Sequence, residues 1–178
     1  MAGDVHVLQV GINKYPSNVG ALSGCVNDVR RLHEYLEKMF GNSVHVVQLL
    51  DANASRDEVI RAFRTHLGQA GPGDTVLFHY SGHGARCKSA PEFREYFPDG
   101  WDEGLVLHDS RNPGGYDLAD KELAILLAEI ADNDPHLVVL LDCCHSGSAT
   151  RGADDFSQLR VRQTHAIHEP RPIETYLD

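Results

Sequence analysis

The stretches VLFHYSGHG at residues 76–84 and LVVLLDCCHSG at residues 137–147 decide the fold of this chain. Each starts as a strand-like run of mostly apolar residues and ends in small and polar residues. The carboxyl ends of parallel strands open into one crevice, where chemistry collects. A histidine at the first strand end and a cysteine at the second can meet there, as a thiol nucleophile and its proton-transfer partner must.

Strand and helix signals alternate along the chain. Apolar runs predict strands at 5–12, 44–50, 75–80 and 137–141, and apolar residues at helical spacing predict helices at 26–39, 55–67 and 123–130. Ser55 followed by Glu58 resembles a capping box at the start of the second helix. The stretch 84–118, rich in Gly, Pro and Asp, is expected to be irregular. This order predicts an α/β fold with a mostly parallel sheet and helices on both faces.

The alternation ends near residue 150, which divides the chain into two parts. Residues 1–150 are expected to form the catalytic domain, and residues 151–178 a loop or linker. Four strands leave one long edge of the sheet open, and an open edge tends to pair with another segment. We therefore expect a small subunit or another partner to cover this edge.

The composition of the 178 residues is ordinary for a globular protein, with 42% hydrophobic and 24% charged residues. The formal charge of −10 argues against a nucleic-acid surface, which needs clustered basic residues. No apolar run is long enough to span a membrane, and the first residues lack the pattern of a secretory signal. Two of the four cysteines are adjacent, so reduced thiols are expected. These features predict a cytoplasmic protein without nucleic-acid or membrane partners.

The reactive side chains allow two chemical interpretations. A cysteine attacks as the thiolate, and its pKa of about 8.5 must be lowered by a cation, a helix dipole or a base. His83, between two glycines, is uncrowded and favours the interpretation as a cysteine protease. Zinc is the rival, because His79, His83 and Cys87 recur at a spacing of four and further ligand types follow at 143–145. That spacing aligns ligands only on a helix, which the neighbouring glycines disfavour.

Four segments in this order resemble the metacaspases and their bacterial relatives, which are caspase-like peptidases. The segments are GCVND at 24–28, YSGHG at 80–84, DGWDE at 99–103 and DCCHSG at 142–147. The resemblance extends from residue 5 to about residue 150. It implies the caspase–hemoglobinase fold, a three-layer sandwich, and a cysteine endopeptidase.

The resemblance also implies which residues act in catalysis. The family's Asp-x-Cys-His-Ser-Gly motif selects Cys144 as the nucleophile and leaves Cys143 at a variable position, as a small packed side chain. His83 matches the histidine of the catalytic dyad and would help to protonate the leaving amine. The backbone N–H groups of Gly84 and Cys144 would form the oxyanion hole.

An acidic pocket is implied for the substrate residue before the cut. In metacaspases this pocket takes Arg or Lys, and its residues correspond here to Asp28, Ser81 and Asp142. Each could instead have a local role, Asp28 in the first turn of a helix and the other two at strand ends. Together with the dyad they favour protein or peptide substrates that are cut after Arg or Lys, and they disfavour cleavage after Asp.

Two features depart from the family's pattern, and the first concerns calcium. Many metacaspases bind calcium through acidic residues near the site, and Asp102 and Asp120 match two of these. Lys121 and Arg151 stand where two further acids are often found. Because calcium needs several anionic or carbonyl oxygens, these positive charges predict an activity that needs neither calcium nor another cofactor.

The second departure is length, because the family's catalytic segment is normally followed by a smaller one that completes the sheet. The sequence could be a fragment, a processed subunit or a compact variant. Arg151, Arg160, Arg162 and Arg171 are candidate sites of self-cleavage, although ordinary surface arginines explain them equally well. The alternative function is a non-catalytic caspase-fold scaffold or a regulated subunit, in which the missing segment leaves the site unformed.

Overall fold

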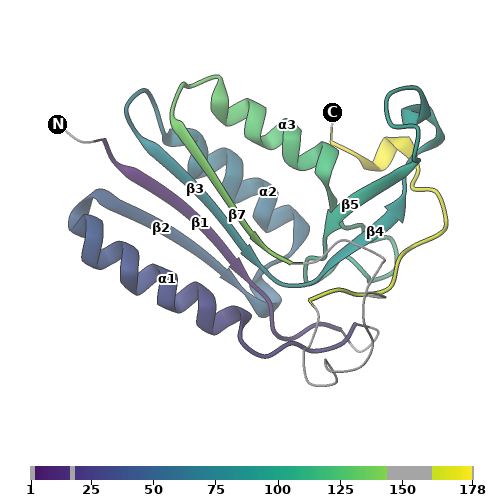
Figure 1. Ribbon diagram of the computed structural model, residues 1–178, viewed down its shortest axis with the longest axis horizontal. Helices are drawn as coiled ribbons and strands as arrows, with labels where there is room; N and C mark the ends of the chain where they lie inside the picture. Colours follow the sequence, from purple (N-terminus) through teal and green to yellow (C-terminus); the bar gives the residue numbers. More distant parts are fainter. Residues whose placement is uncertain (1–2, 17–18, 144–161, 178) are drawn as a thin grey trace, which may run out of the picture.

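A parallel sheet of four strands forms the centre of the described part of the chain (Figure 1). The computed structural model describes residues 3–16, 19–143 and 162–177. The strands of this sheet are β1 (Val5–Gly11), β2 (Val44–Leu50), β3 (Thr75–Ser81) and β7 (His136–Asp142), in the order β2-β1-β3-β7. All the pairings are parallel, and the predicted strands are confirmed to within one residue at each end.

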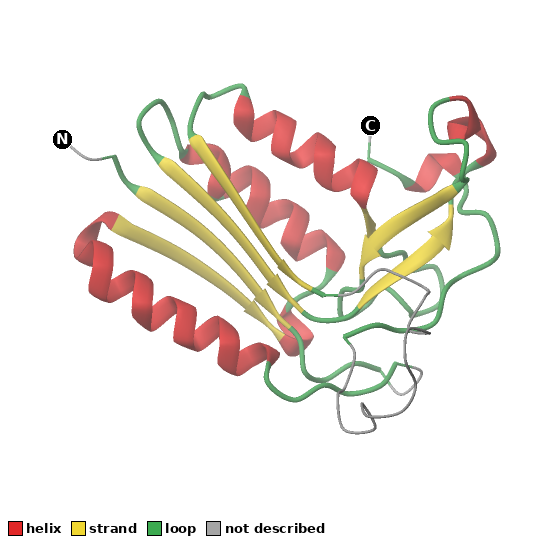
Figure 2. Cartoon of the chain, in the orientation of Figure 1, coloured by secondary structure: helices red, strands yellow, loops and turns green. Residues whose placement is uncertain are grey.

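Helices cover both faces of this sheet (Figure 2). They are α1 (Cys25–Phe40), α2 (Arg56–Thr65) and α3 (Asp120–Ala131), and 3₁₀ turns lie at Gly41–Ser43, Asp51–Asn53, Leu67–Gln69, Pro91–Glu95 and Ile173–Thr175. On one face, Leu36 of α1 packs with Val7 and Leu77. On the other, Phe63 of α2 and Leu126 of α3 belong to the main core. The α/β fold class predicted from the sequence is confirmed.

The start of α2 follows the sequence signal. Ser55 precedes the helix with extended backbone, and its Oγ accepts a hydrogen bond from the Glu58 N–H at 3.3 Å. Such a cap satisfies one of the N–H groups that the first turn leaves unpaired. Within the described ranges, no helix has the length and apolar character that crossing a membrane requires.

The prediction of an irregular stretch at 84–118 is wrong. This stretch contains β4 (Gly84–Lys88), β5 (Trp101–Leu105) and the first strand residue of β6 (Leu118–Ala119), which form a second, antiparallel sheet. The strands have only two to five residues, and turn-rich segments separate them, so the sequence carries no long alternating pattern. The second sheet bears on the site because β4 begins directly after His83.

Residues 162–177 lie beside β4 and reach α3 (Figure 1). The segment forms isolated parallel bridges to β4 at Gln163 and Ile167. Arg171 is 3% exposed and donates two hydrogen bonds of 2.9 Å to the Glu122 carboxylate on α3. Arg171 is therefore a buried anchor of this segment and not an ordinary surface arginine.

β7 lies at one edge of the parallel sheet. Its apolar residues 138–141 are 39–46% exposed, and no strand of the described residues pairs with its outer side. An unpaired apolar edge is a template for pairing with a further segment. The partner that the sequence predicts for this edge stays a prediction.

Candidate active site

Strand register brings the predicted strand-end residues together at the carboxyl ends of the parallel strands. Ser81 at the end of β3 pairs with Gly11 of β1 on one side and with Asp142 of β7 on the other. The Ser81 hydroxyl donates to Asp142 Oδ2 at 3.3 Å. Asp28 lies in the first turn of α1, the helix that follows β1. Two carboxylates and a hydroxyl therefore lie near the carboxyl ends of these strands.

The loop that carries His83 is fixed by two tyrosines. The His83 backbone N–H donates to Tyr15 Oη at 2.9 Å, and the His83 carbonyl accepts from Tyr80 Oη at 2.7 Å. A Cβ at Gly82 would lie 2.5 Å from Tyr80 Oη and 2.7 Å from Tyr15 Oη, so a larger residue would have to push these hydroxyls away. The Tyr15 ring also packs on the imidazole, with 5.0 Å between ring centroids. Both the backbone and the ring of His83 are thus held in place.

The imidazole of His83 is held in one tautomer. Its Nε2 lies 2.7 Å from the Gly20 carbonyl oxygen, and because a carbonyl only accepts, Nε2 carries the proton. In the neutral ring Nδ1 is then the basic nitrogen, and it is buried without a hydrogen-bond partner among the described residues. Burial lowers the pKa of this imidazole, although the hydrogen bond to Gly20 opposes the shift. A neutral, oriented base is what proton transfer from a thiol requires.

The acidic pocket, formed by Asp28, Ser81 and Asp142, surrounds the guanidinium of Arg162. Arg162 Nη2 lies 2.6 Å from Asp28 Oδ2, and Nη1 lies 2.6 Å from Ser81 Oγ. The guanidinium also forms an ion pair with Asp142. The planar guanidinium of arginine carries separate N–H groups that can bind several acceptors at once. The single ammonium of a lysine suits this set of acceptors less well. The structure thus brings together the residues predicted for the acidic pocket.

The main chain of Arg162 makes a further contact beside this pocket. Its carbonyl oxygen accepts a hydrogen bond from the Gly84 N–H at 3.0 Å. This N–H is one of the two groups that the resemblance assigns to the oxyanion hole. The same residue therefore has its side chain in the acidic pocket and its carbonyl on a predicted oxyanion donor.

Two further residues lie close to the acidic pocket. Gly24 precedes α1 with φ of 130°, a conformation that favours glycine, and a Cβ there would lie 3.6 Å from Arg162 Nη2. His79 lies two residues before Ser81 on β3 and is 3% exposed. Burial lowers the pKa of His79, the charge of Asp28 opposes this shift, and the charge of Arg162 adds to it. The charges of the acidic pocket therefore affect the pKa of His79.

Sequence reasoning missed two of the groups that position His83. Gly20 acts only through its backbone carbonyl, 63 positions from the imidazole that it orients, so no residue type marks it. Tyr15 follows β1 in a loop without a recognisable motif. Only its place as an aromatic residue shortly after a predicted strand could have drawn attention to it.

The predicted nucleophile, Cys144, lies outside the described residues. Its backbone N–H, the second predicted oxyanion donor, lies outside them as well, as do Arg151 and Arg160. Cys143 is described, and it packs, partly buried, against the main core as expected for the variable position. The linker expected at 151–178 stays a prediction, because the structure describes it only from residue 162.

The positions that match the family's calcium ligands hold a lysine ammonium. Lys121 Nζ forms an ion pair with Asp102 Oδ1 and lies 3.5 Å from Asp120 Oδ1. Asp102 is fully buried, and its second oxygen accepts a hydrogen bond from the Tyr176 hydroxyl. Both oxygens of Asp102 are thus engaged, and a positive charge lies beside them. The residues present do not fit a calcium ion.

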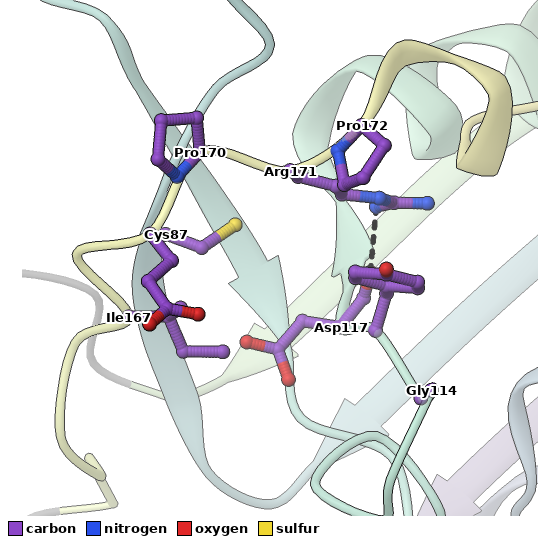
Figure 3. A pocket seen from close by; sticks show the side chains of 10 residues that line it. Cys87, Gly114, Asp117, Ile167, Pro170, Arg171 and Pro172 are labelled. Carbon is purple, nitrogen blue, oxygen red and sulfur yellow. Dashed lines mark hydrogen bonds between the residues drawn. The ribbon is translucent and has the colours of Figure 1, made fainter.

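A pocket of about 320 Å³ lies between Cys87 of β4, residues 114–117 and the C-terminal segment, and His83 does not line it (Figure 3). Cys87, Asp117 and Arg171 line it, whereas none of the acidic-pocket residues does. Burial raises the pKa of Cys87 to about 12, which favours the protonated thiol over the nucleophilic thiolate. In the part of the chain that the structure describes, no group of three or more His, Cys, Asp or Glu could hold a metal ion.

The sequence matches a known family over most of its length. The family profile described as "Metacaspase, peptidase C14 domain" matches residues 6–151. The chain belongs to the metacaspase family. Its curated relatives include metacaspase-2 of Trypanosoma brucei brucei, 34% identical over 152 residues, and metacaspase-1 of Botryotinia fuckeliana, 32% identical over 154 residues. The resemblance drawn from the sequence segments is therefore confirmed.

The matches cover most of this metacaspase chain and a smaller part of each relative. They span 81% and 83% of this chain but 42% and 35% of the two relatives, so the chain spans about two fifths of their length. A crystal structure of protein GSU0716 from Geobacter sulfurreducens is similar to this fold, with a TM-score of 0.69 at 28% identity. That match covers 90% of this chain and 57% of the other. The metacaspases are a family of cysteine peptidases, so the family match supports membership of a cysteine peptidase family.

Proposed function

We propose that this chain carries the catalytic site of a cysteine endopeptidase that cuts after Arg and, less efficiently, after Lys. Cys144 is the proposed nucleophile and His83 its proton-transfer partner, as the family resemblance implies. Membership of a cysteine peptidase family supports the class of reaction. The contacts made by the acidic pocket support the class of substrate.

The observation that carries the proposal is the acidic pocket beside the His83 loop. Asp28 and Ser81 bind the guanidinium of Arg162, and the adjacent Gly84 N–H binds the carbonyl oxygen of the same residue. An arginine in a substrate can make the same contacts with its side chain and its carbonyl. A substrate aspartate would instead meet the carboxylates of the pocket, and like charges disfavour its binding.

The proposed reaction uses the orientation of the imidazole. His83 Nδ1 takes the proton of the Cys144 thiol, and the thiolate attacks the carbonyl carbon of the substrate arginine. The backbone N–H groups of Gly84 and Cys144 stabilise the charge that develops on the carbonyl oxygen. The imidazolium, whose Nε2–H stays on the Gly20 carbonyl, then protonates the leaving amine. Water finally hydrolyses the thioester.

We propose further that this activity does not require calcium. Lys121 supplies a fixed positive charge beside Asp102 and Asp120, where a metal ion would otherwise balance the acids. A divalent cation would have to displace this largely buried ammonium before it could bind. The contacts of Lys121 therefore support an active site that needs no metal ion.

Hydrolysis of fluorogenic peptides tests the proposal. The peptides differ only in having Arg, Lys, Gln or Asp before the reporter group, and each is incubated with the protein with and without a chelator. Cleavage after Arg and Lys that is lost in Cys144→Ala and kept in the matched control Cys143→Ala supports the proposal. Cleavage after Asp, or cleavage that survives in Cys144→Ala, contradicts it. Dependence on calcium contradicts only the proposal about the metal.

One observation favours a second function, that of a caspase-fold scaffold or regulated subunit. The apolar residues 138–141 on the edge strand β7 are 39–46% exposed, and a small subunit or another partner could pair with this edge. A covalent probe directed by arginine separates the two functions. Labelling that requires Cys144 and His83 supports the enzyme, whereas a folded sample that takes up no label supports the scaffold.

A further inference from the structure

β7 has the composition of an inner strand, although it lies at an edge of the parallel sheet (Figure 1). Its residues 137–141 are all apolar, and because successive side chains of a strand point to opposite faces, both faces of β7 are apolar. Such continuous runs are typical of parallel strands that are covered on both faces. Residues 138–141 are nevertheless 39–46% exposed. Charged residues or prolines usually protect an edge strand, and residues 137–141 contain neither.

The two ends of β7 carry chemically complementary groups. His136 begins the strand and Asp142 ends it, and both residues are exposed. A second β7 strand in the same direction would place histidine beside histidine and carboxylate beside carboxylate. In an antiparallel pair centred on Val139, a histidine lies opposite a carboxylate at both ends, and opposite charges in such positions stabilise a pair of strands. β7 is therefore complementary to itself in the antiparallel direction, as the interface of a two-fold dimer must be.

A hollow beside β7 also fits an antiparallel copy. It measures about 170 Å³, and the four leucines and two acids that line it are Leu105, Leu118, Leu123, Leu141, Glu103 and Asp120. The antiparallel pair places Leu137 of the second copy directly opposite Leu141, on the same face of the joined sheet. An apolar side chain of the second copy thus lies beside an apolar hollow of the first.

We propose that β7 is a dimerisation strand, and that it pairs with the β7 strand of a second copy of this chain in an antiparallel arrangement centred on Val139. The added strand forms main-chain hydrogen bonds with the outer side of β7, and its side chains supply specificity. Residue 137 then lies opposite residue 141, and residue 138 opposite residue 140, so apolar side chains cover one another along the strand. Because the two strands run in opposite directions, the acidic pockets of the two copies lie at opposite ends of the joined strands.

Analytical ultracentrifugation of the full chain over a range of concentrations tests this inference. We expect the mass to rise from one copy toward two as the concentration increases. Val139→Lys sets two ammonium groups against each other at the two-fold axis and should leave a single copy at every concentration. Tyr35→Lys, at an exposed apolar position of α1, is the matched control and should leave the association unchanged. Circular dichroism checks that each variant is folded.

Charge changes at His136 test the direction of the strands. His136→Glu sets a carboxylate opposite Asp142 at both ends of the pair, and we expect the association to weaken about two- to thirtyfold. His136→Lys supplies a permanent positive charge at the same place and should strengthen the association. Equal effects of the two variants would overturn the antiparallel pairing.

Disulfide cross-linking tests the register. In a chain whose Cys143 and Cys144 are replaced by alanine, Val139→Cys brings two thiols directly opposite each other and should give a covalent dimer under mild oxidation. Leu141→Cys, at a position of similar exposure, is the matched control. Its two thiols lie four residues apart along the pair, so it should give no covalent dimer. Equal cross-linking of the two variants would overturn the proposed register.

Amide hydrogen exchange of residues 137–141 separates a second copy from other occupants of the edge. We expect exchange of the outward amides to slow as the concentration rises and the dimer forms. Slow exchange at every concentration, in a chain that stays a single copy, would mean that a segment of the same chain covers the edge, and this result overturns the inference. Fast exchange without association overturns it as well, as does a dimer that survives Val139→Lys.

Discussion

Two acidic clusters of this chain each hold a cation of the chain itself, and they differ in how deeply they hold it. In the acidic pocket, the side chain of Arg162 is 21% exposed and that of its partner Asp28 is 39% exposed. In the second cluster, the side chain of Lys121 is 10% exposed and that of Asp102 is fully buried. The arginine belongs to the C-terminal segment, whereas the lysine belongs to α3, next to β5.

The difference separates a cluster that can exchange its cation from one that is built around it. A partly exposed carboxylate keeps much of its hydration, so a substrate can replace Arg162 at Asp28 without stranding a buried charge. Asp102 without Lys121 would be an uncompensated charge in the interior. The first cluster is therefore suited to recognition and the second to structure.

We expect the largest effect from removing the Lys121 ammonium. If this effect proves small, the contrast between the two clusters does not hold. Lys121→Ala leaves Asp102 unpaired, and we expect the free energy of unfolding to fall by about 3–5 kcal/mol, the usual cost of breaking a buried ion pair. Urea denaturation measures this loss. A double variant, Lys121→Met with Asp102→Asn, removes both charges and should recover most of it. A loss below about 1 kcal/mol, typical of an exposed pair, would show that this cluster resembles the acidic pocket.

The acidic pocket should respond in binding rather than in stability. Asp28→Asn removes one charged acceptor. We expect this to cost about 1.5–3 kcal/mol of transition-state stabilisation, so kcat/KM for an arginine peptide should fall roughly ten- to a hundredfold. The free energy of unfolding should change little, because Asp28 is partly exposed. Steady-state kinetics and urea denaturation check the two parts. Asp57→Asn, at an exposed first-turn aspartate of α2, is the matched control and should change neither.

The loop that carries His83, next to the acidic pocket, offers a steric test. Gly82→Ala places a Cβ against the hydroxyls of Tyr80 and Tyr15. We expect a loss of about 1–3 kcal/mol in unfolding free energy, as for other overpacked sites, together with lower peptidase activity as His83 shifts. Adding Tyr80→Phe removes the nearest hydroxyl oxygen and should restore part of the stability. No change in thermal unfolding on Gly82→Ala would mean that the tyrosines do not fix this loop.

Stability should fall as the pH is lowered below about 6.5, the ordinary pKa of histidine. Burial lowers the pKa of His83, and also that of His66 and His79, so the unfolded chain binds protons before the folded one does. The stabilisation is therefore complete above pH 6.5 and is lost toward the lower pKa of the folded state. Each group contributes at most about 1.4 kcal/mol per pH unit. Urea denaturation across this range should give a shallower slope for His83→Gln, and an equal slope would contradict the burial of this imidazole.

Removing divalent metal ions should have the smallest effect. Because Lys121 already neutralises Asp102, we expect a chelator to leave both the melting temperature and the peptidase activity unchanged. Differential scanning fluorimetry and the arginine-peptide assay measure these quantities. A fall in either that added calcium reverses would show that the ion competes successfully with the ammonium.

The parallel sheet and its helices could be predicted because their signals are local. Apolar runs mark β3 and β7, and Ser55 with Glu58 marks the start of α2. The second sheet could not be predicted in this way. Its strands are short, and β6 has only two residues, so pairing across a turn-rich stretch decides its structure rather than any periodic pattern.

For the acidic pocket, too, the sequence predicted some features and not others. The family resemblance named its members, and the strand register explains why Ser81 and Asp142 are neighbours. The partner of these residues was beyond sequence reasoning, which treated Arg162 and Arg160 alike. Arg162 lies 134 positions from Asp28, and only the pairing of its segment with β4 sets the contact.

The most direct test is a cleavage profile of a peptide library, taken with the wild-type chain and with Cys144→Ala. It tests whether the carboxylates of the acidic pocket select arginine for a cysteine nucleophile. We predict cuts after Arg, fewer after Lys and none after Asp, and no cuts at all with Cys144→Ala. Cuts after Asp or after apolar residues, or equal cutting by both proteins, would contradict the account.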